Sequence, residues 1–461
     1  MIEPRRPRRA LLAVIAASVL SSLDLFVVNL AFGSIHQAFA TATDQGMSWV
    51  INGYGIAFAA LLVPSGRLAD HFGARRAFRS GLLLFAVSSA LCAAAPALEV
   101  LIAARTLQGI GAALLVPTSL GLLLSSTPPD RHRRMVGLWT ATGSAAAALG
   151  PALGGLLVQV DWRWIFLINV PVALLALVFS RDLVDSPGSD ARLPDLWGSV
   201  ILAIGVGALV TGISYEGWAS RGATVAGVLL LVVFVWRCTR VPAPALDLQL
   251  FRVTSFSVST IGMLCFYAGF GAMLLSGPLY LTQVWHWDTV RAGVGMCAGP
   301  AAAVLSSSLF GRLRVEARFS AVLGGALFAA AACWWLVMLD GGANFFIGFM
   351  PGSIMTGTAA GIVQTAFLAG GTANLSSSVY STAAGVLNTA RQVGAALGVA
   401  VLVALGGAGQ RPEEFRPVWI FIAVVAGIAA VTGFFLRDRA PVESANEPPS
   451  GRPAALPTSQ A

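Results

Sequence analysis

The sequence predicts an all-α membrane protein that crosses the bilayer many times. Of its 461 residues, 56% are hydrophobic and only 11% are charged, whereas soluble domains carry about 25% charged residues. Apolar stretches long enough to span a hydrocarbon core of about 30 Å recur along the chain. The 50 glycines fit this class, because close packing of helices in lipid favours small residues.

Fourteen apolar segments follow one another, and we expect each to be a membrane-spanning helix. They lie near residues 10–32, 47–66, 78–95, 98–118, 135–158, 164–180, 196–214, 222–236, 255–282, 290–310, 319–338, 344–369, 378–406 and 416–436. An even number of crossings places both termini on the same side of the membrane. The first segment contains Asp24 and is too long for the apolar core of a signal peptide, so we expect it to be retained.

Arginine placement predicts which side that is. All 29 basic residues are arginine, and 22 of them fall on the side that holds the termini. Five fall on the other side, namely Arg163, Arg221, Arg291, Arg411 and Arg416, and Arg105 and Arg391 lie within segments. The positive-inside rule therefore predicts cytoplasmic termini. The same asymmetry accounts for the net charge of +8, so we expect no nucleic-acid partner.

A weak internal repeat predicts the domain organisation. Gly66-Arg67-Leu68 recurs as Gly311-Arg312-Leu313, and Gly137-Leu138 is echoed by Gly385-Val386. The two offsets nearly agree, as two six-helix bundles with two inserted helices would require. The expected parts are a basic tail (1–9), an N-terminal bundle (10–182), two inserted helices with linkers (183–242), a C-terminal bundle (243–437) and a disordered cytoplasmic tail (438–461). Repeat-built bundles are typical of secondary transporters.

Two opposite charges lie deep within the predicted membrane. Asp24 is roughly 22 Å from the inner surface and Arg105 roughly 12 Å from the outer one, so their depths agree within about one helical turn. An intramembrane arginine costs a few kcal/mol and needs a partner. We predict that the two side chains form a proton-coupling pair in a shared cavity. Burial favours the neutral acid and Arg105 favours the carboxylate, so small movements would switch its protonation.

The stretch 66–76 predicts a tight cytoplasmic turn that acts as a conformational latch. Its glycines permit close approach and positive φ, and its acid can accept from helix N-termini or arginines of a neighbouring loop. An ordinary positive-inside loop is the alternative, but it would not explain an acid bracketed by glycines. The latch residues are Gly66, Arg67, Asp70, Gly73, Arg75 and Arg76.

These stretches resemble motifs of the major facilitator superfamily. The loop is similar to its signature G-x-L-A-D-x-x-G-R-[KR]-[KR]. Further stretches resemble motifs of its fourteen-helix drug:proton antiporters: Leu23 to Ala31, Trp49 to Tyr54, Arg105 to Ala113, Gly143 to Leu157, Trp162 to Pro171 and, less specifically, Asn388 to Gly394. The resemblance implies the major facilitator fold and export of drugs in exchange for protons. It also favours a hinge at Gly150, Pro151 and Gly154, where a proline removes a helix hydrogen bond.

Several polar and aromatic side chains are candidates to line a substrate cavity. Gln108 lies three residues from Arg105 on the same helical face, and Phe266, Tyr267 and Phe270 suit flat or cationic ligands. Core packing is the alternative for each aromatic residue, and snorkelling is the alternative for Arg391 if its helix begins near Ala384. The candidates are Asn29, Trp49, Tyr54, Gln108, Phe266, Tyr267, Asn388, Arg391 and Gln392.

Together these features predict a monomeric exporter in a bacterial inner membrane. It would exchange amphipathic, cationic or aromatic drugs, or a natural product, for protons by alternating access. A proton symporter for uptake of a polar solute is the runner-up, and a membrane enzyme or channel is a remote alternative. Lysine is absent, so no nucleotide-binding P-loop exists. The five scattered cysteines and four histidines indicate no metal or cofactor, so the expected partners are a small-molecule drug or metabolite, protons and lipid.

Overall fold

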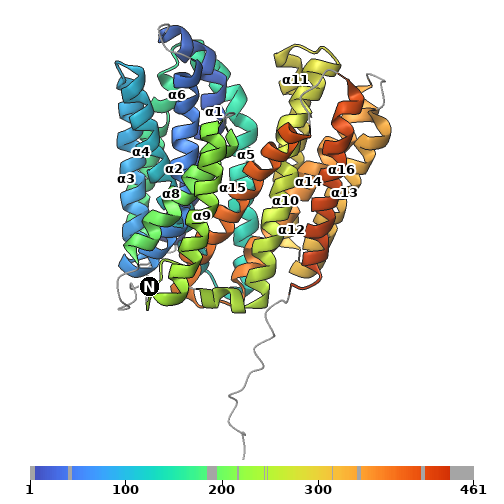
Figure 1. The fold of residues 1–461 in the computed structure, drawn as a ribbon. Coiled ribbons are helices and arrows are strands. Elements are labelled where there is room, and N and C mark those ends of the chain that lie inside the picture. Colours follow the sequence, from blue (N-terminus) through green and yellow to red (C-terminus); the bar gives the residue numbers. More distant parts are fainter. Residues whose placement is uncertain are drawn as a thin grey trace, which may run out of the picture.

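The computed structural model describes residues 6–39, 44–183, 195–214, 218–242, 244–246, 248–313, 315–339, 344–405 and 411–436, and this part of the chain is a bundle of long helices (Figure 1). Each of the fourteen predicted segments coincides with one helix or with consecutive helices. The N-terminal group comprises α1 (Arg6–Ala38), α2 (Asp44–Phe72), α3 (Ala74–Ala94), α4 (Leu98–Ser125), α5 (His132–Val158) and the consecutive pair α6 (Trp164–Leu167) and α7 (Asn169–Phe179).

Two further helices, α8 (Leu196–Ser214) and α9 (Trp218–Arg240), precede the C-terminal group. That group comprises α10 (Thr254–Leu279), the pair α11 (Thr289–Met296) and α12 (Ala298–Arg312), α13 (Ala317–Met338), α14 (Met350–Thr372), α15 (Tyr380–Ala404) and α16 (Pro412–Gly433). Single π-helical turns extend α10 to Val284 and precede α14 from Phe345. The predicted domain boundaries agree with this grouping and remain a prediction.

Ten helical stretches among the described residues are long and apolar enough to cross a membrane. They include Trp218–Arg240, the helix that corresponds to the short segment 222–236. The all-helical membrane fold is therefore established, and fourteen crossings remain a prediction.

Reporter fusions would test the fourteen crossings and the orientation of the termini. Fusions at residues 188 and 448 should both report a cytoplasmic location, because arginines crowd that side. A fusion near Gly342 should report an external location. An external signal at 448 would show that one crossing was miscounted.

Hydroxyl side chains are accommodated inside apolar helices by bonding to their own backbone. Ser88 donates to Leu84 O at 2.7 Å, and Thr365 donates to Gly361 O at 2.8 Å. A polar group without a partner costs several kcal/mol in hydrocarbon, so this internal bonding allows such residues to occur at membrane depth. Many of the serines and threonines in these helices are therefore structural and are not candidates for a site.

The two groups of helices contact each other near one end, which we call the terminal end because α1 begins there and α16 ends there (Figure 1). A Cβ atom added to Gly137 on α5 would lie 2.6 Å from the Cα of Gly311 on α12. One added to Gly385 on α15 would lie 2.6 Å from the backbone oxygen of Leu62 on α2. Only glycine permits such close backbone approach.

This packing gives a physical reason for the internal repeat. Gly66 lies on α2 and its echo Gly311 on α12, whereas Gly137 lies on α5 and its echo Gly385 on α15. The structure packs α2 against α15 and α12 against α5. Each half thus contributes one copy of each motif. The contact of α2 with α15 and the contact of α12 with α5 are therefore related by pseudosymmetry.

The inserted helices form a hairpin held by an ion pair. Asp195, which precedes α8, accepts hydrogen bonds from Arg237 Nε at 2.5 Å and from Arg237 Nη2 at 2.8 Å. This two-pronged contact holds the pKa of the Asp195 carboxyl below its usual range. Helix α8 also packs on α2 and α15, one helix from each group. The hairpin therefore lies beside the contact between the two halves.

Candidate functional site

Asp24 and Arg105 form an ion pair in the interior of the N-terminal group. Arg105 Nη1 lies 2.6 Å from Asp24 Oδ2, and the side chains are 1% and 0% exposed, respectively. The pair joins α1 to α4 across 81 positions of sequence. Its formation agrees with the depth match expected from the sequence.

Neutral side chains complete the coordination of the carboxylate. Gln108 Nε2 donates to Asp24 Oδ1 at 2.9 Å, and Asn169 Nδ2 on α7 donates to the same oxygen at 3.2 Å. The other proton of the Gln108 amide goes to Ser89 Oγ on α3, at 2.7 Å. Asp24 thus accepts three hydrogen bonds from side chains on two helices.

Arg105 is held by backbone and aromatic contacts as well. Its Nε donates to Val50 O at 3.1 Å, and Nη1 also donates to Gln108 Oε1 at 2.6 Å. Its guanidinium carbon lies 4.4 Å from the ring centroid of Tyr54 and 5.7 Å from that of Phe166. Desolvated cation–π contacts of this kind contribute up to about 2 kcal/mol.

The pair is closed to solvent in this conformation, and the shared cavity expected from the sequence remains a prediction. Asp24, Arg105, Gln108, Asn169 and Tyr54 are each at most 1% exposed. All of their described partners belong to the N-terminal group. A proton or a substrate can therefore reach Asp24 only after these helices move.

Sequence reasoning missed three members of this cluster. The sequence places Asn169 and Phe166 only within the motif stretch Trp162 to Pro171, and it gives Ser89 no role. Asn169 is the one amide in the apolar stretch from Trp164 to Phe179, and that isolation was a usable signal. Ser89 carried none, because most serines here bond to their own helix. Asn29 lies on α1, but its side chain is outside the described residues.

Asp70 bonds to the start of α15 and so joins the two halves at the terminal end. Its Oδ2 accepts from Thr382 N at 2.7 Å and from Thr382 Oγ1 at 2.6 Å, and its Oδ1 accepts from Ser381 N at 3.3 Å. The first amides of a helix lack backbone partners and carry partial positive charge, so a carboxylate is stabilised there. The turn predicted over 66–76 is confined to Gly73, because Asp70 lies in the last turn of α2 and Arg75 and Arg76 lie in the first turn of α3. The latch role predicted for Asp70 thus has a defined partner.

The glycines of the stretch 66–76 are explained by geometry. A Cβ atom added to Gly66 would overlap the backbone oxygen of Ser381. Gly73, between α2 and α3, has a φ of 101°. Arg67, Arg75 and Arg76 form no ion pair among the described residues. The contact between halves therefore depends on Asp70 and the helix amides, and not on loop arginines.

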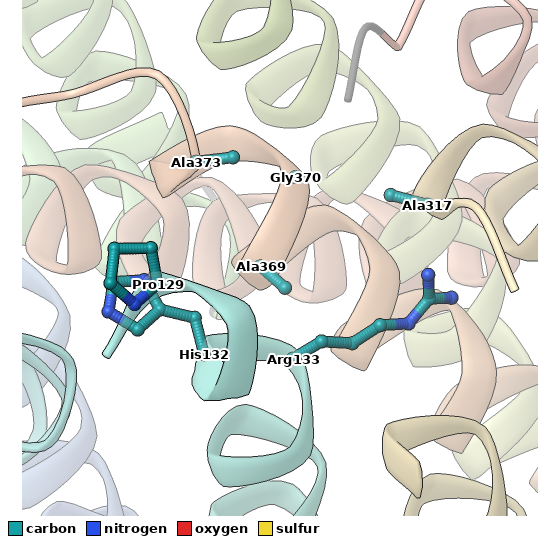
Figure 2. Close-up of a pocket in the computed structure, with 7 residues that line it drawn as sticks. All are labelled: Pro129, His132, Arg133, Ala317, Ala369, Gly370 and Ala373. Carbon is teal, nitrogen blue, oxygen red and sulfur yellow. The ribbon is translucent and has the colours of Figure 1, made fainter. Parts of the chain in front are cut away.

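A small pocket lies beside a second contact at this end (Figure 2). Arg133, at the start of α5, extends towards Ala317 and donates to Ser320 Oγ and, at 3.5 Å, to Glu316 O. The pocket is lined by Pro129, His132, Arg133, Ala317, Ala369, Gly370 and Ala373. Here the charge comes from the N-terminal half, as it does at Asp70, but it is positive.

The predicted hinge lies within an unbroken helix. Helix α5 runs from His132 to Val158 through Gly150 and Pro151. Gly154 packs closely on α1, since a Cβ there would lie 3.2 Å from Val27 O. The structure thus assigns Gly154 a packing role, and a hinge at these residues remains a prediction.

Some of the remaining cavity candidates are buried, and the others are partly exposed. Phe266 is fully buried and its ring contacts Phe328, so it is a core residue. Tyr267 is in contact with Arg391, whose guanidinium carbon lies 5.8 Å from the tyrosine ring centroid. Asn388 is buried and donates to Ala384 O of its own helix. Gln392 is partly exposed, as is Trp49 on α2.

Arg391 lies in the middle of α15. This helix begins at Tyr380, eleven residues before Arg391, which places Arg391 roughly 16 Å along the helix axis. The snorkelling alternative depended on a helix start near Ala384, and that start is wrong. The depth of Arg391 in the membrane remains a prediction.

Two helical groups that bury an ion pair at membrane depth define this chain as a membrane transporter. Among the described residues, no group of three or more His, Cys, Asp or Glu side chains is placed to hold a metal ion. The chain belongs to the Major Facilitator Superfamily, whose sequence profile matches residues 14–399. This confirms the resemblance seen in the sequence motifs, and the family is one of transporters and not of enzymes.

Related proteins of this family are resistance and export proteins. The chain is 36% identical over 447 residues to the methylenomycin A resistance protein of Bacillus subtilis, a match that covers 89% of this chain and 94% of that protein. It is 36% identical to the puromycin resistance protein pur8 of Streptomyces alboniger, with 86% of this chain and 81% of that protein covered. It is 32% identical to the multidrug export protein EmrB of Haemophilus influenzae, with 74% and 69% covered.

A solved structure shares the fold. The human organic anion transporter MFSD10 aligns with a TM-score of 0.66 over 94% of this chain and 100% of its own, at 15% identity. That identity supports the fold alone. The protein is thus a multi-pass membrane transporter of the superfamily, related to antibiotic resistance and drug export proteins.

Proposed function

We propose that this protein exports an amphipathic small molecule in exchange for protons by alternating access, with both termini in the cytoplasm. The observation that carries the proposal is the buried Asp24–Arg105 pair, the one acid–base pair deep in the described bundle. The relatedness to resistance and export proteins supports the direction of transport.

With cytoplasmic termini, this conformation faces outward. The contacts at Asp70, Gly66, Gly137 and Gly385 close the terminal end, which is then the cytoplasmic end. Transport would require these contacts to open while the other end closes. One contact joins α2 to α15 and the other joins α5 to α12. Breaking both contacts would permit one half to rock against the other.

In the proposed cycle Asp24 holds the proton only when its neighbours separate. Asp24 here accepts three hydrogen bonds and is closed to solvent, and we assign this arrangement to the step of the cycle at which the coupled proton has left. Protonation would weaken the ion pair with Arg105 and release α4 from α1. Because Asp24 is closed to solvent, a substrate would not displace the proton by touching Asp24. Proton and substrate would instead favour different arrangements of the helices, so that binding at one site lowers the affinity at the other.

Proton release from purified protein in proteoliposomes tests this function. Addition of cationic, neutral and anionic drugs from a resistance panel should release protons in proportion to binding. Uptake of protons on addition of a polar nutrient, with no response to any drug, would instead support the symporter.

Replacing Asp70 by asparagine should loosen the cytoplasmic closure. The substitution removes the negative charge from a group that accepts three hydrogen bonds from α15. The amide oxygen of asparagine still accepts, so we expect a net loss of about 1.5 kcal/mol, at the low end of the contribution of a single bond to a charged group. A buried reporter cysteine, Ala384→Cys, should then be labelled from the cytoplasmic side about tenfold faster. The background would carry serine at the exposed Cys297 and Cys333.

The matched control is Arg181→Gln, which alters an exposed charge outside the predicted latch. Its labelling should equal that of the parent. If Asp70→Asn also leaves labelling unchanged across a substrate titration, the loop has no latch role and serves only to set orientation.

A further inference from the structure

The arginine in the middle of α15 has no acidic partner. Among the described residues Arg391 forms no ion pair, and its Nε atom is buried without a hydrogen bond. A charge at this depth is costly unless something compensates it. In the other half, the positive charge of Arg105 is neutralised by the carboxylate of Asp24.

The sequence offers Arg391 no carboxylate at its own level. Helices α2, α4, α8, α10 and α14 pack against α15. The acids of these helices lie near their ends, at Asp44 and Asp70 of α2 and at Glu99 of α4, and α8, α10 and α14 contain none. Asp70 already accepts from Thr382, nine residues from Arg391. No acid of these helices is therefore placed to neutralise Arg391, and its side chain is partly exposed, so an anion from outside the protein can reach it.

The neighbours of Arg391 present donors and aromatic surface. Tyr267 donates its hydroxyl proton to Gln364 Oε1 at 2.8 Å, so the Gln364 amide is turned with its NH₂ group away from that bond. This NH₂ group makes no hydrogen bond to the described residues. Phe270 lies beside them, with its ring centroid 5.5 Å from that of Tyr267. A guanidinium, an amide donor and aromatic rings suit a carboxylate attached to a flat apolar body.

The same geometry disfavours a cationic ligand at this position. An aromatic wall attracts cations when its faces are free, which is why the sequence suggested a cationic drug. Arg391 already lies near the Tyr267 ring, 5.8 Å from its centroid. A second cation would be repelled by the first.

We propose that Arg391, together with Gln364 and Tyr267, binds the acidic group of the transported molecule, so that the substrate is an aromatic organic acid. This inference rests on the proposed export function and specifies its substrate class. A lipid phosphate is not the expected ligand, because Arg391 lies roughly 16 Å along its helix and below the headgroup region.

Three probes that differ in one group test the proposal on the full-length protein in lipid nanodiscs. They are 2-naphthoate, its methyl ester and 2-naphthylmethylammonium, with affinities measured by calorimetry. The wild type should bind naphthoate roughly tenfold more tightly than the ester, and the ammonium most weakly. Arg391→Gln should lose that tenfold preference and keep its affinity for the ester.

Gln364→Glu is a second variant that keeps the shape of the side chain. It supplies a carboxylate beside Tyr267 and Arg391, which should reduce naphthoate affinity roughly tenfold without changing ester affinity. It decides the question if Arg391→Gln fails to fold. Arg291→Gln is the matched control, because it removes a positive charge from the same half outside the membrane, where Arg291 lies against Trp287.

The outcomes separate this inference from the proposed function. Asp24→Asn should lose proton release but still prefer naphthoate to its ester. If Arg391→Gln loses both proton release and the preference for naphthoate, and its affinity falls equally for all three probes, the role of Arg391 is structural and the inference is overturned. A wild-type preference for the ammonium would overturn it as well, and would leave proton coupling at Asp24 untouched.

Discussion

Asp24→Asn is expected to abolish proton release on substrate addition and to end uphill export. The amide keeps the size of the side chain but cannot lose or gain the coupled proton. It also removes the negative charge that lies 2.6 Å from Arg105 Nη1. Proton release should fall to the level of protein-free liposomes, while a neutral hydrophobic substrate can still bind. Both quantities are measurable in the same proteoliposomes with a pH-sensitive dye and a labelled drug.

The control for this change is Asp161→Asn. Asp161 is a partly exposed acid on the same half and pairs with Arg163 at 3.6 Å, where an ion pair contributes little. It should transport like the wild type. Continued proton release and uphill export by Asp24→Asn at the wild-type rate would place the coupling site elsewhere and make the buried pair purely structural.

Arg105→Ala should be inactive and markedly less stable. Removing one partner leaves an uncompensated buried carboxylate, which typically costs about 3–5 kcal/mol. It also vacates the bonds to Val50 O and Gln108 and the contact with Tyr54. Asp24 would either bury an unpaired charge or take up a proton at a cost in free energy, and in both cases no proton would be released on substrate binding. Thermal unfolding in detergent and the proteoliposome assay measure the two effects separately.

The double variant Asp24→Asn/Arg105→Ala distinguishes the cause of this loss. Without the carboxylate there is no unpaired charge, so the double variant should unfold at a higher temperature than Arg105→Ala alone. It should remain inactive. A double variant that is less stable than Arg105→Ala would show that lost packing, and not the buried charge, dominates.

Much of the fold could be predicted from the sequence because lipid imposes simple requirements. A spanning helix must be long and apolar, so all fourteen predicted segments coincide with helices, and the start of α15 lies within two residues of the predicted boundary. The depth of Asp24 and Arg105 could also be counted, because rise per residue is constant. Their pairing followed from depth and opposite charge alone.

What could not be predicted was the rotation of each helix about its axis. Depth does not say whether Asp24 faces the other half or the interior of its own, and the structure shows the interior. The same uncertainty concealed Asn169 and Ser89, which reach the pair from α7 and α3. Thr382 could not be identified as the partner of Asp70, because the two lie 312 positions apart and only tertiary packing joins them.

The sealing of Asp24 has a consequence for the energy supply of the cell. A carrier whose acid could always exchange protons with both sides of the membrane would let protons leak through. Such a leak would dissipate the transmembrane proton gradient. Here the acid is enclosed by Arg105, Gln108 and Asn169. If the proposed proton exchange takes place at Asp24, a carrier with this pair intact would conduct no protons, and the proton gradient would be consumed only when a substrate is carried.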